Sequence, residues 1–302
     1  MENKAAEKPR KETSPRKKKI IRSIIHTLIF LIGLIIVVSC GVFLYANYTK
    51  THYEISFYQE TSQKVTHNIR MAVISDLHNR EYGEKNATLI TDLKALKPDM
   101  ILFLGDMINR EDGHYEPMLE LGTALSQVAP CYGVLGNHES ERMYYYDDKK
   151  LPQKFEEAGV TILRNTQKTI KIGADSVQLI GLEGTPFGFE EYGGRKFMDE
   201  QTPNSNAYTV VMNHIPFTFR DQISDYPFDL GIAGHTHGGL MILPFFEGVY
   251  TAEEGFFPKY FAGRYKLKQG QPLIISRGMA DSSPWPRVNN MPELVIIDVN
   301  CY

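Results

Sequence analysis

Cysteine is scarce in this sequence, with three residues in a chain of 302. Cys40 lies within an apolar run, so only Cys131 and Cys301 fall in the remainder of the chain. Three cysteines do not make a disulfide framework. Because Cys131 is next to a predicted central strand, we expect it to be a small, buried apolar residue.

The large C-terminal part of the chain also lacks an excess of positive charge. Residues 1–19 carry eight Lys or Arg and three acidic residues, whereas residues 49–302 carry 24 basic and 33 acidic side chains. A surface for DNA or RNA needs the opposite balance, because it must neutralise phosphates. We therefore expect no nucleic acid among the main partners.

Charged side chains are absent from residues 24–45, which read IIHTLIFLIGLIIVVSCGVFLY. A helix of this length crosses a hydrocarbon core of about 30 Å. The sequence therefore predicts a transmembrane signal anchor at 20–48, after a disordered basic tail at 1–19. Lys17, Lys18, Lys19 and Arg22 precede the apolar run and place the N-terminus in the cytoplasm, with the large domain outside a bacterial cytoplasmic membrane.

Two alternatives to an uncleaved anchor stay open. A cleaved signal peptide normally has a shorter apolar core and a cleavage site with small residues. The stretch Val37–Cys40 resembles a lipoprotein signal, although the residues after Cys40 remain apolar. We favour the uncleaved anchor, and both it and the lipidated form leave the domain on the same face of the membrane.

The remainder of the chain predicts an α/β domain at 69–302, joined to the anchor by a juxtamembrane segment at 49–68. Short apolar and β-branched runs predict buried strands at Met71–Ser75, Met100–Leu104, Tyr132–Leu135, Val177–Ile180, Tyr208–Met212, Asp229–Ala233, Leu273–Ile275 and Leu294–Val299. Helical patterns at Glu84–Leu96 and Glu116–Gln127 separate the first strands and indicate parallel pairing there. The second half, with shorter connections, predicts a more mixed sheet.

Five short motifs follow the predicted strands. They are Asp76-Leu77-His78, Gly105-Asp106, Gly136-Asn137-His138-Glu139, Asn213-His214 and Gly234-His235-Thr236-His237-Gly238-Gly239. Ligands of open α/β sheets bind outside the carboxyl ends of the strands. In extended chain, residues i and i+2 point to the same side, so each Asp-x-His or His-x-His pair can reach one centre or two adjacent centres.

The chemistry of these side chains points to divalent metal ions. Carboxylate, imidazole and amide oxygen suit Mn, Fe or Zn, and the lack of thiolate argues against a structural zinc site. Seven candidate ligands are too many for one ion and fit two: Asp76, His78, Asp106, Asn137, His214, His235 and His237. Two ions about 3.5–4 Å apart need a bridging carboxylate, and Asp106 is the natural choice.

With these motifs in this order, the sequence resembles the calcineurin-like metallophosphoesterase superfamily. The resemblance covers about residues 69–300 and implies a two-sheet sandwich with helices outside, in an α-β-β-α arrangement. It implies one ion held by Asp76, His78, Asp106 and His237, and a second held by Asp106, Asn137, His214 and His235. His138 matches a residue that binds no metal and lies beside the substrate phosphate.

The mechanism expected from this resemblance is hydrolysis. Two ions would lower the pKa of a shared water to give hydroxide, which attacks phosphorus in line with the leaving oxygen. His138 would protonate the leaving group or hydrogen-bond the transition state. Arginine forks match phosphate oxygens, which makes four arginines candidates for substrate binding: Arg80, Arg110, Arg277 and Arg287.

Protein phosphatases of the superfamily carry an acidic residue three positions after the bridging aspartate, and this chain has Asn109 there. The sequence is more similar to bacterial membrane-associated phosphodiesterases, in the segments Gly255–Tyr260, Ser276–Gly278 and Pro286–Glu293. Phosphodiester or pyrophosphate substrates follow as the expectation, such as envelope lipids or cell-wall polymers.

The aromatic segment Leu240–Gly270 has two interpretations. It is either an apolar wall for a lipid substrate or a covering loop packed on the second sheet, and we favour packing because aromatic residues usually serve it.

Two other functions compete with the enzyme. One is an envelope sensor or scaffold without turnover, and the other is a structural metal-binding module. The complete set of candidate ligands argues against the first. An accessible two-ion site with a spare histidine, His138, would be a poor structural module.

Overall fold

The computed structural model describes residues 15–184, 189–201, 206–243, 247–280 and 286–302, so most of the expected basic tail lies outside the described residues. The chain forms two compact units, residues 1–45 and residues 46–302. Helix α1 (Pro15–Thr49) is long and apolar enough to cross a membrane, a property that signal sequences share. It begins earlier than we expected: residues 15–19 are helical and not disordered, because proline suits the first helical position and lysine is a good helix former.

The first sheet of the second unit has six strands in the order β1-β16-β2-β3-β4-β5. Strands β2 to β5 are parallel to one another, and β16 is antiparallel to β2. Their bounds are β1 (Glu54–Ser62), β2 (Ile69–Ile74), β3 (Met100–Phe103), β4 (Cys131–Gly133), β5 (Val160–Ile162) and β16 (Glu293–Cys301).

Strand β1 corrects one expectation. The segment 49–68, which we expected to be a juxtamembrane connection, contributes a nine-residue strand that pairs in parallel with β16 from Glu54 to Ser62. Strand β1 has no clear alternation of apolar and polar residues in the sequence, because Glu60 is its only buried residue. The pairing partner lies more than 200 residues away, so only the folded sheet identifies the segment as part of the domain.

The second sheet is mixed, as expected, in the order β14-β15-β9-β8-β7-β6. Its four inner strands are parallel and its two edge strands are antiparallel. The bounds are β6 (Thr166–Ile172), β7 (Asp175–Gly181), β8 (Tyr208–Met212), β9 (Leu230–Ala233), β14 (Gly263–Lys266) and β15 (Pro272–Ile275).

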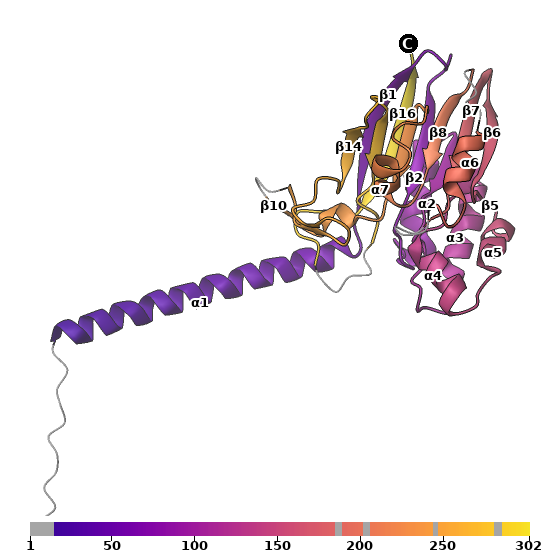
Figure 1. The fold of residues 1–302 in the computed structure, drawn as a ribbon. Helices are drawn as coiled ribbons and strands as arrows, with labels where there is room; N and C mark the ends of the chain where they lie inside the picture. Colours follow the sequence, from indigo (N-terminus) through magenta and orange to yellow (C-terminus); the bar gives the residue numbers. More distant parts are fainter. Residues whose placement is uncertain (1–14, 185–188, 202–205, 244–246, 281–285) are drawn as a thin grey trace, which may run out of the picture. The chain divides into compact units, whose positions relative to one another are not determined.

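Three apolar clusters separate four layers, which gives the expected α-β-β-α sandwich. Alternate residues of each strand face opposite sides, so Ala72 and Ile74 pack toward helices while Met71 and Val73 pack between the sheets. Figure 1 shows these layers, with helices beside the strands of the second unit. The first sheet packs against α2 (Ala87–Leu96), α3 (Glu116–Ser126) and α5 (Leu151–Glu157), and the second against α6 (Gly194–Glu200) and α7 (Pro216–Asp221). Cys131 is buried as expected.

Short elements complete the unit. They are η1 (Glu84–Asn86), α4 (Asn137–Tyr145), η2 (His237–Gly239), β10 (Ile242–Leu243), β11 (Glu247–Gly248), β12 (Tyr250–Thr251) and β13 (Gly255–Phe256). Strand β10 pairs with β11 and β12 with β13, both antiparallel. We call the described residues 240–243 and 247–257 the hairpin segment.

Candidate metal centre

The five motifs meet at the carboxyl ends of parallel strands from both sheets. Asp76 follows β2, Asp106 follows β3 and Asn137 follows β4 in the first sheet. His214 and His235 follow the neighbouring strands β8 and β9 of the second sheet. Because the two sheets pack face to face, these strand ends converge on one site.

The backbone of the site is unusual, because five of its side chains sit at residues in the left-handed region. The φ angles are 52° at Asp76, 47° at His78, 51° at Asp106, 72° at His235 and 47° at His237. Residues other than glycine seldom adopt such angles, and they cluster where the surrounding fold holds a functional geometry. The strands thus end in sharp turns that aim consecutive polar side chains at one point.

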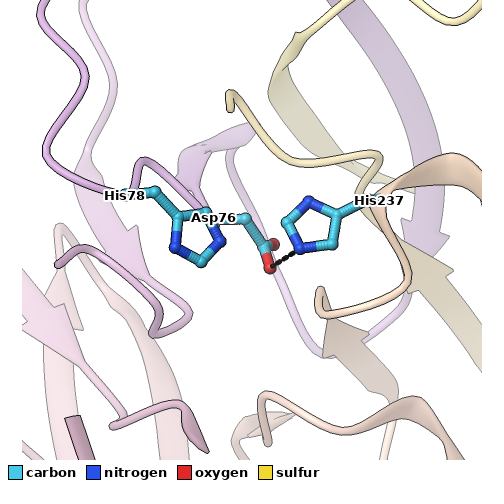
Figure 2. A group of neighbouring side chains, drawn as sticks. All are labelled: Asp76, His78 and His237. Carbon is cyan, nitrogen blue, oxygen red and sulfur yellow. Dashed lines mark ion pairs between the residues drawn. The ribbon is translucent and has the colours of Figure 1, made fainter. Parts of the chain in front are cut away.

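The candidate ligand atoms form three overlapping clusters. They are Asp76 with His78 and His237, His78 with Asp106 and His138, and Asp106 with His214 and His235. Figure 2 shows the first cluster, where Nε2 of His237 lies 3.7 Å from Oδ1 of Asp76. Nε2 of His214 lies 3.2 Å from Oδ2 of Asp106. Asp106 is shared by two clusters, which is what a bridging carboxylate requires.

The described residues fit divalent cations. Both ring nitrogens of His78 and Oδ1 of Asn137 are buried without a hydrogen-bond partner in the described structure, although such atoms are nearly always paired. Asp76 and Asp106 are 0% and 1% exposed, and their ion-pair partners among the described residues are histidines. Two buried carboxylates without lysine or arginine need another source of positive charge.

The pKa shifts of Asp106 and His214 arise from the attraction between the buried carboxylates and the histidines. Burial alone would raise the pKa of Asp106, but the surrounding histidines, above all His214, hold it well below its usual range. Burial would lower the pKa of His214, yet the charges of Asp106 and Asp76 raise it to about 10. The carboxylates therefore attract a positive charge to this point, and a metal ion can take the place of that proton.

Backbone carbonyls orient two of the histidines. Nδ1 of His214 lies 2.7 Å from the carbonyl of Leu104, and Nδ1 of His237 lies 2.9 Å from the carbonyl of Ala280. A histidine that donates one N–H to a carbonyl presents its other nitrogen as a metal ligand. Both rings thus direct Nε2 into the site.

Glu139 holds two of the motif loops together, a role that we did not expect from the sequence. Its carboxylate, buried in α4, accepts N–H bonds from Gly136, Asp106 and Met107 at 2.7–2.8 Å. Burial and the charge of Asp106 raise the pKa of Glu139 to about 7, against the effect of these donors. The bonds fix the loop after β3 to the loop after β4.

His138 lies beside the clusters with its ring in a defined orientation. Its Nδ1 accepts the backbone N–H of Arg110 at 3.2 Å, and its Nε2 is 4.0 Å from Oδ2 of Asp106. A neutral histidine with Nδ1 as acceptor carries its proton on Nε2. Asn109 points elsewhere, because its Nδ2 donates to the carbonyl of His78 and to Asp112. No described carboxylate accepts a hydrogen bond from Nδ1 of His138.

Glu253 is a second residue that the sequence interpretation missed. It lies in the turn between β12 and β13, and its carboxylate contacts Nε2 of His235. With Nε2 engaged in this way, Nδ1 is the nitrogen of His235 that can ligate a metal. The glutamate lies 18 residues after His235, and no local pattern marks it.

The four candidate arginines lie in different surroundings from one another. Arg110 pairs with Glu111 and Glu141, Arg277 pairs with Glu54 and Glu293, and Arg80 is half-buried. Arg287 donates to the carbonyls of Arg277 and Ala280, and the latter also accepts from His237. Arg287 and the candidate ligand His237 therefore share the carbonyl of Ala280 as a hydrogen-bond acceptor. Phosphate binding by these four arginines stays a prediction.

A cavity of about 650 Å³ opens over the clusters. Asp106, Asn137, His138, His235 and His237 line its polar side. Its other side is the hairpin segment, with lining residues Leu240, Met241, Val249, Tyr250, Thr251, Ala252 and Phe256. Part of the aromatic segment therefore borders the site, while Tyr260 and Tyr265 pack against the third core cluster as we expected.

Comparison with known proteins identifies the family. The family model described as calcineurin-like phosphoesterase matches residues 69–239, which include the candidate ligands and His138. The chain belongs to this family.

The curated relatives carry related names. The metallophosphoesterase YkuE of Bacillus subtilis is 25% identical over 83% of this chain and 87% of its own. The phosphodiesterase YaeI of Escherichia coli is 24% identical over 76% and 82%. The UDP-2,3-diacylglucosamine pyrophosphatase LpxG of Chlamydia muridarum is 23% identical over 76% and 83%. A solved dimetal phosphatase from Danio rerio matches with a TM-score of 0.36 at 12% identity, over 72% of this chain and 89% of that one.

Proposed function

We propose that this protein hydrolyses phosphodiester or pyrophosphate bonds at a dinuclear metal site on the outer face of the bacterial cytoplasmic membrane. The observation that carries the proposal is the set of three overlapping ligand clusters, each of which contributes at least one residue to the lining of the same cavity. The relatives named as a phosphodiesterase and a pyrophosphatase support the class of bond. Helix α1 and the basic residues in its first turns support the location.

Seven side chains would hold the ions. Asp76, His78, Asp106 and His237 would take one, and Asp106, Asn137, His214 and His235 the other, with Asp106 bridging. Mn, Fe or Zn suits this mixture of carboxylate, imidazole and amide oxygen. The bound ions would supply Lewis acidity and an activated water at neutral pH.

The other residues of the cavity bind and orient the substrate. Nε2–H of His138 would donate to the oxygen of the leaving group, because Nδ1 is occupied by the N–H of Arg110. The phosphorus–oxygen bond to the leaving group breaks as the oxygen of water bonds to phosphorus. One proton of that water ends on the leaving oxygen, and the other remains on the phosphate product or passes to solvent.

The test uses the full chain in detergent micelles, stripped of metal and then given Mn, Zn, Fe or no ion. Hydrolysis of bis(p-nitrophenyl) phosphate and p-nitrophenyl phosphate is followed for each preparation. We expect turnover that depends on metal and favours the diester. Equal turnover with and without metal would contradict the dinuclear site.

Two variants separate the roles of the residues. We expect Asp106→Asn to lose activity together with bound metal, and His138→Ala to lose about 10²–10⁴-fold in kcat while it keeps both ions. Asp147→Asn and His114→Ala are matched controls, since both residues are exposed and outside the cavity. Full activity in both site variants would refute the proposal.

A further inference from the structure

The hairpin segment gives an apolar wall to the cavity that the ligand clusters also line. Six of its residues line the space with carbon: Leu240, Met241, Val249, Tyr250, Ala252 and Phe256. A volume of about 650 Å³ is within the range of pockets that enclose small ligands. The wall lies beyond the metal ligands, so it faces the part of a substrate that is attached to the reacting phosphoryl group.

Backbone bonds hold this wall against the last histidine motif. The N–H of Val249 donates to the carbonyls of Gly239 and Met241, at 3.1 and 2.9 Å, and Nδ2 of Asn290 donates to the carbonyl of His237 at 2.7 Å. Gly248 lies so near Phe261 that a Cβ would come within 2.8 Å of the ring. The contact of Glu253 with His235 adds a bond from the same segment. The apolar wall is therefore a built part of the site.

The outer rim of the wall is aromatic and exposed. Phe256 is 73% exposed, Phe257 59% and Tyr250 38%, and the rings of Tyr250 and Phe256 lie edge to face with centroids 5.4 Å apart. Burial of such a side chain stabilises a protein, so the fold gains nothing from leaving it in water. Grouped exposed apolar side chains next to a cavity indicate a surface that binds an apolar ligand.

The lack of positive charge on this side of the cavity argues against a polyanionic group in the part of the substrate that contacts the wall. None of the described lining residues is lysine or arginine, and three of the four candidate arginines pair with protein groups instead. A nucleotide or a polyphosphate would bring further negative charges to an apolar wall without cations. A hydrocarbon chain meets no such penalty.

We propose that the substrate carries a hydrocarbon chain, and that this chain lies along Leu240, Met241, Val249, Tyr250 and Phe256 while the phosphoryl group reaches the metal site. This inference rests on the proposed function and specifies the substrate class as lipid phosphoesters. Helix α1, on the same chain, is long and apolar enough to cross a membrane, where such lipids occur.

The test measures kcat/KM of the metal-loaded full chain for alkyl p-nitrophenyl phosphates with methyl, butyl and octyl groups, below their micelle concentrations. The nitrophenyl group is common to all, so differences report the alkyl chain. We expect kcat/KM to rise by roughly three- to fourfold for each of the first methylenes that become buried. An ether-containing chain of the same length as octyl provides the polar comparison and should be hydrolysed less efficiently.

A pair of variants tests where the alkyl chain of the substrate binds. We expect Phe256→Ser to reduce the octyl-to-methyl ratio of kcat/KM, and Phe57→Ser to leave it unchanged. Phe57 is 54% exposed on the edge strand β1 and does not line the cavity, so it is a matched control.

The outcomes separate the two proposals. Turnover of all esters with no dependence on chain length, or a preference for the ether chain, overturns the lipid inference and leaves the phosphodiesterase intact. An octyl preference that Phe256→Ser does not change overturns the assigned wall. Absence of turnover for every ester, with two ions bound, overturns the proposed function itself.

Discussion

At the scale of single residues, three of the candidate ligands have partners that hold the side chain in one orientation. Carbonyl oxygens fix His214 and His237 through Nδ1, and Glu253 contacts His235 through Nε2. Partners of this kind set the tautomer of a ligating histidine and raise its basicity. Glu253 is the only carboxylate among these three partners, so it supplies charge as well as orientation.

Replacement of Glu253 tests this arrangement. We expect Glu253→Ala to weaken one of the two metal-binding steps by about 10–100-fold, because His235 loses the group that orients its ring. Glu253→Gln keeps an acceptor oxygen and should restore part of the loss. Isothermal titration of Mn or Zn into the stripped full chain measures both steps. Glu200→Ala, at a side chain 64% exposed, is the control, and unchanged affinity in Glu253→Ala would show that the contact has no such role.

At the scale of elements, the loops after β3 and β4 must pass each other closely. A Cβ on Gly136 would lie 2.2 Å from Oδ1 of Asp106 and 2.5 Å from its backbone nitrogen. A Cβ on Gly105, which has a φ of 91°, would lie 2.3 Å from the nitrogen of Gly136. These glycines let the two strand ends approach until Asp106 and Asn137 face the same centre.

The substitution Gly136→Ala therefore acts on metal binding through backbone packing. We expect at least a tenfold weaker metal affinity, because the added methyl group must displace the carboxylate of Asp106. Gly113→Ala is the matched control, since a Cβ there meets nothing within 4 Å. Titration calorimetry of both variants measures the effect. Equal affinities would mean that the loop yields to the methyl group without moving the ligand.

At the scale of the whole molecule, strand β1 forms one edge of the first sheet. It precedes residues 69–239, which the family model matches. It pairs with β16 along nine residues, and Glu60 on β1 binds Arg264 of the second sheet with an Nε–Oε1 distance of 2.6 Å. Tyr53, just before β1, donates to Asp92 on α2. The segment thus bonds to the first sheet, the second sheet and a covering helix.

Two truncated proteins test the boundary of the domain. We expect residues 46–302 to unfold in one cooperative transition, and residues 69–302 to be less stable by several kcal/mol. Each inter-strand hydrogen bond that is lost contributes about 1 kcal/mol, and the edge of β16 becomes exposed. Thermal unfolding followed by circular dichroism compares the two. Equal melting temperatures would show that β1 is dispensable for the fold.

The strand and helix patterns of the sequence by themselves predicted the parallel pairing of the first half, and the motifs added the resemblance that implied the sandwich. The sequence also placed the candidate ligands directly after strands. The reason is local: each motif directly follows an apolar strand, and the carboxyl ends of parallel strands meet at one edge of a sheet. The strand at 54–62 escaped this reasoning, because a shallow pattern at the edge of a sheet is identified only by its partner.

Only the tertiary structure decided which side chains surround those ligands. Arg277 lies against Glu54, 223 residues away, and its charge is therefore engaged by acidic partners. Glu253 contacts His235, and Phe256 lines the cavity, because the hairpin of β12 and β13 packs next to the last histidine motif. Contacts of this kind depend on how separate loops pack against one another, which the order of residues along a strand does not encode.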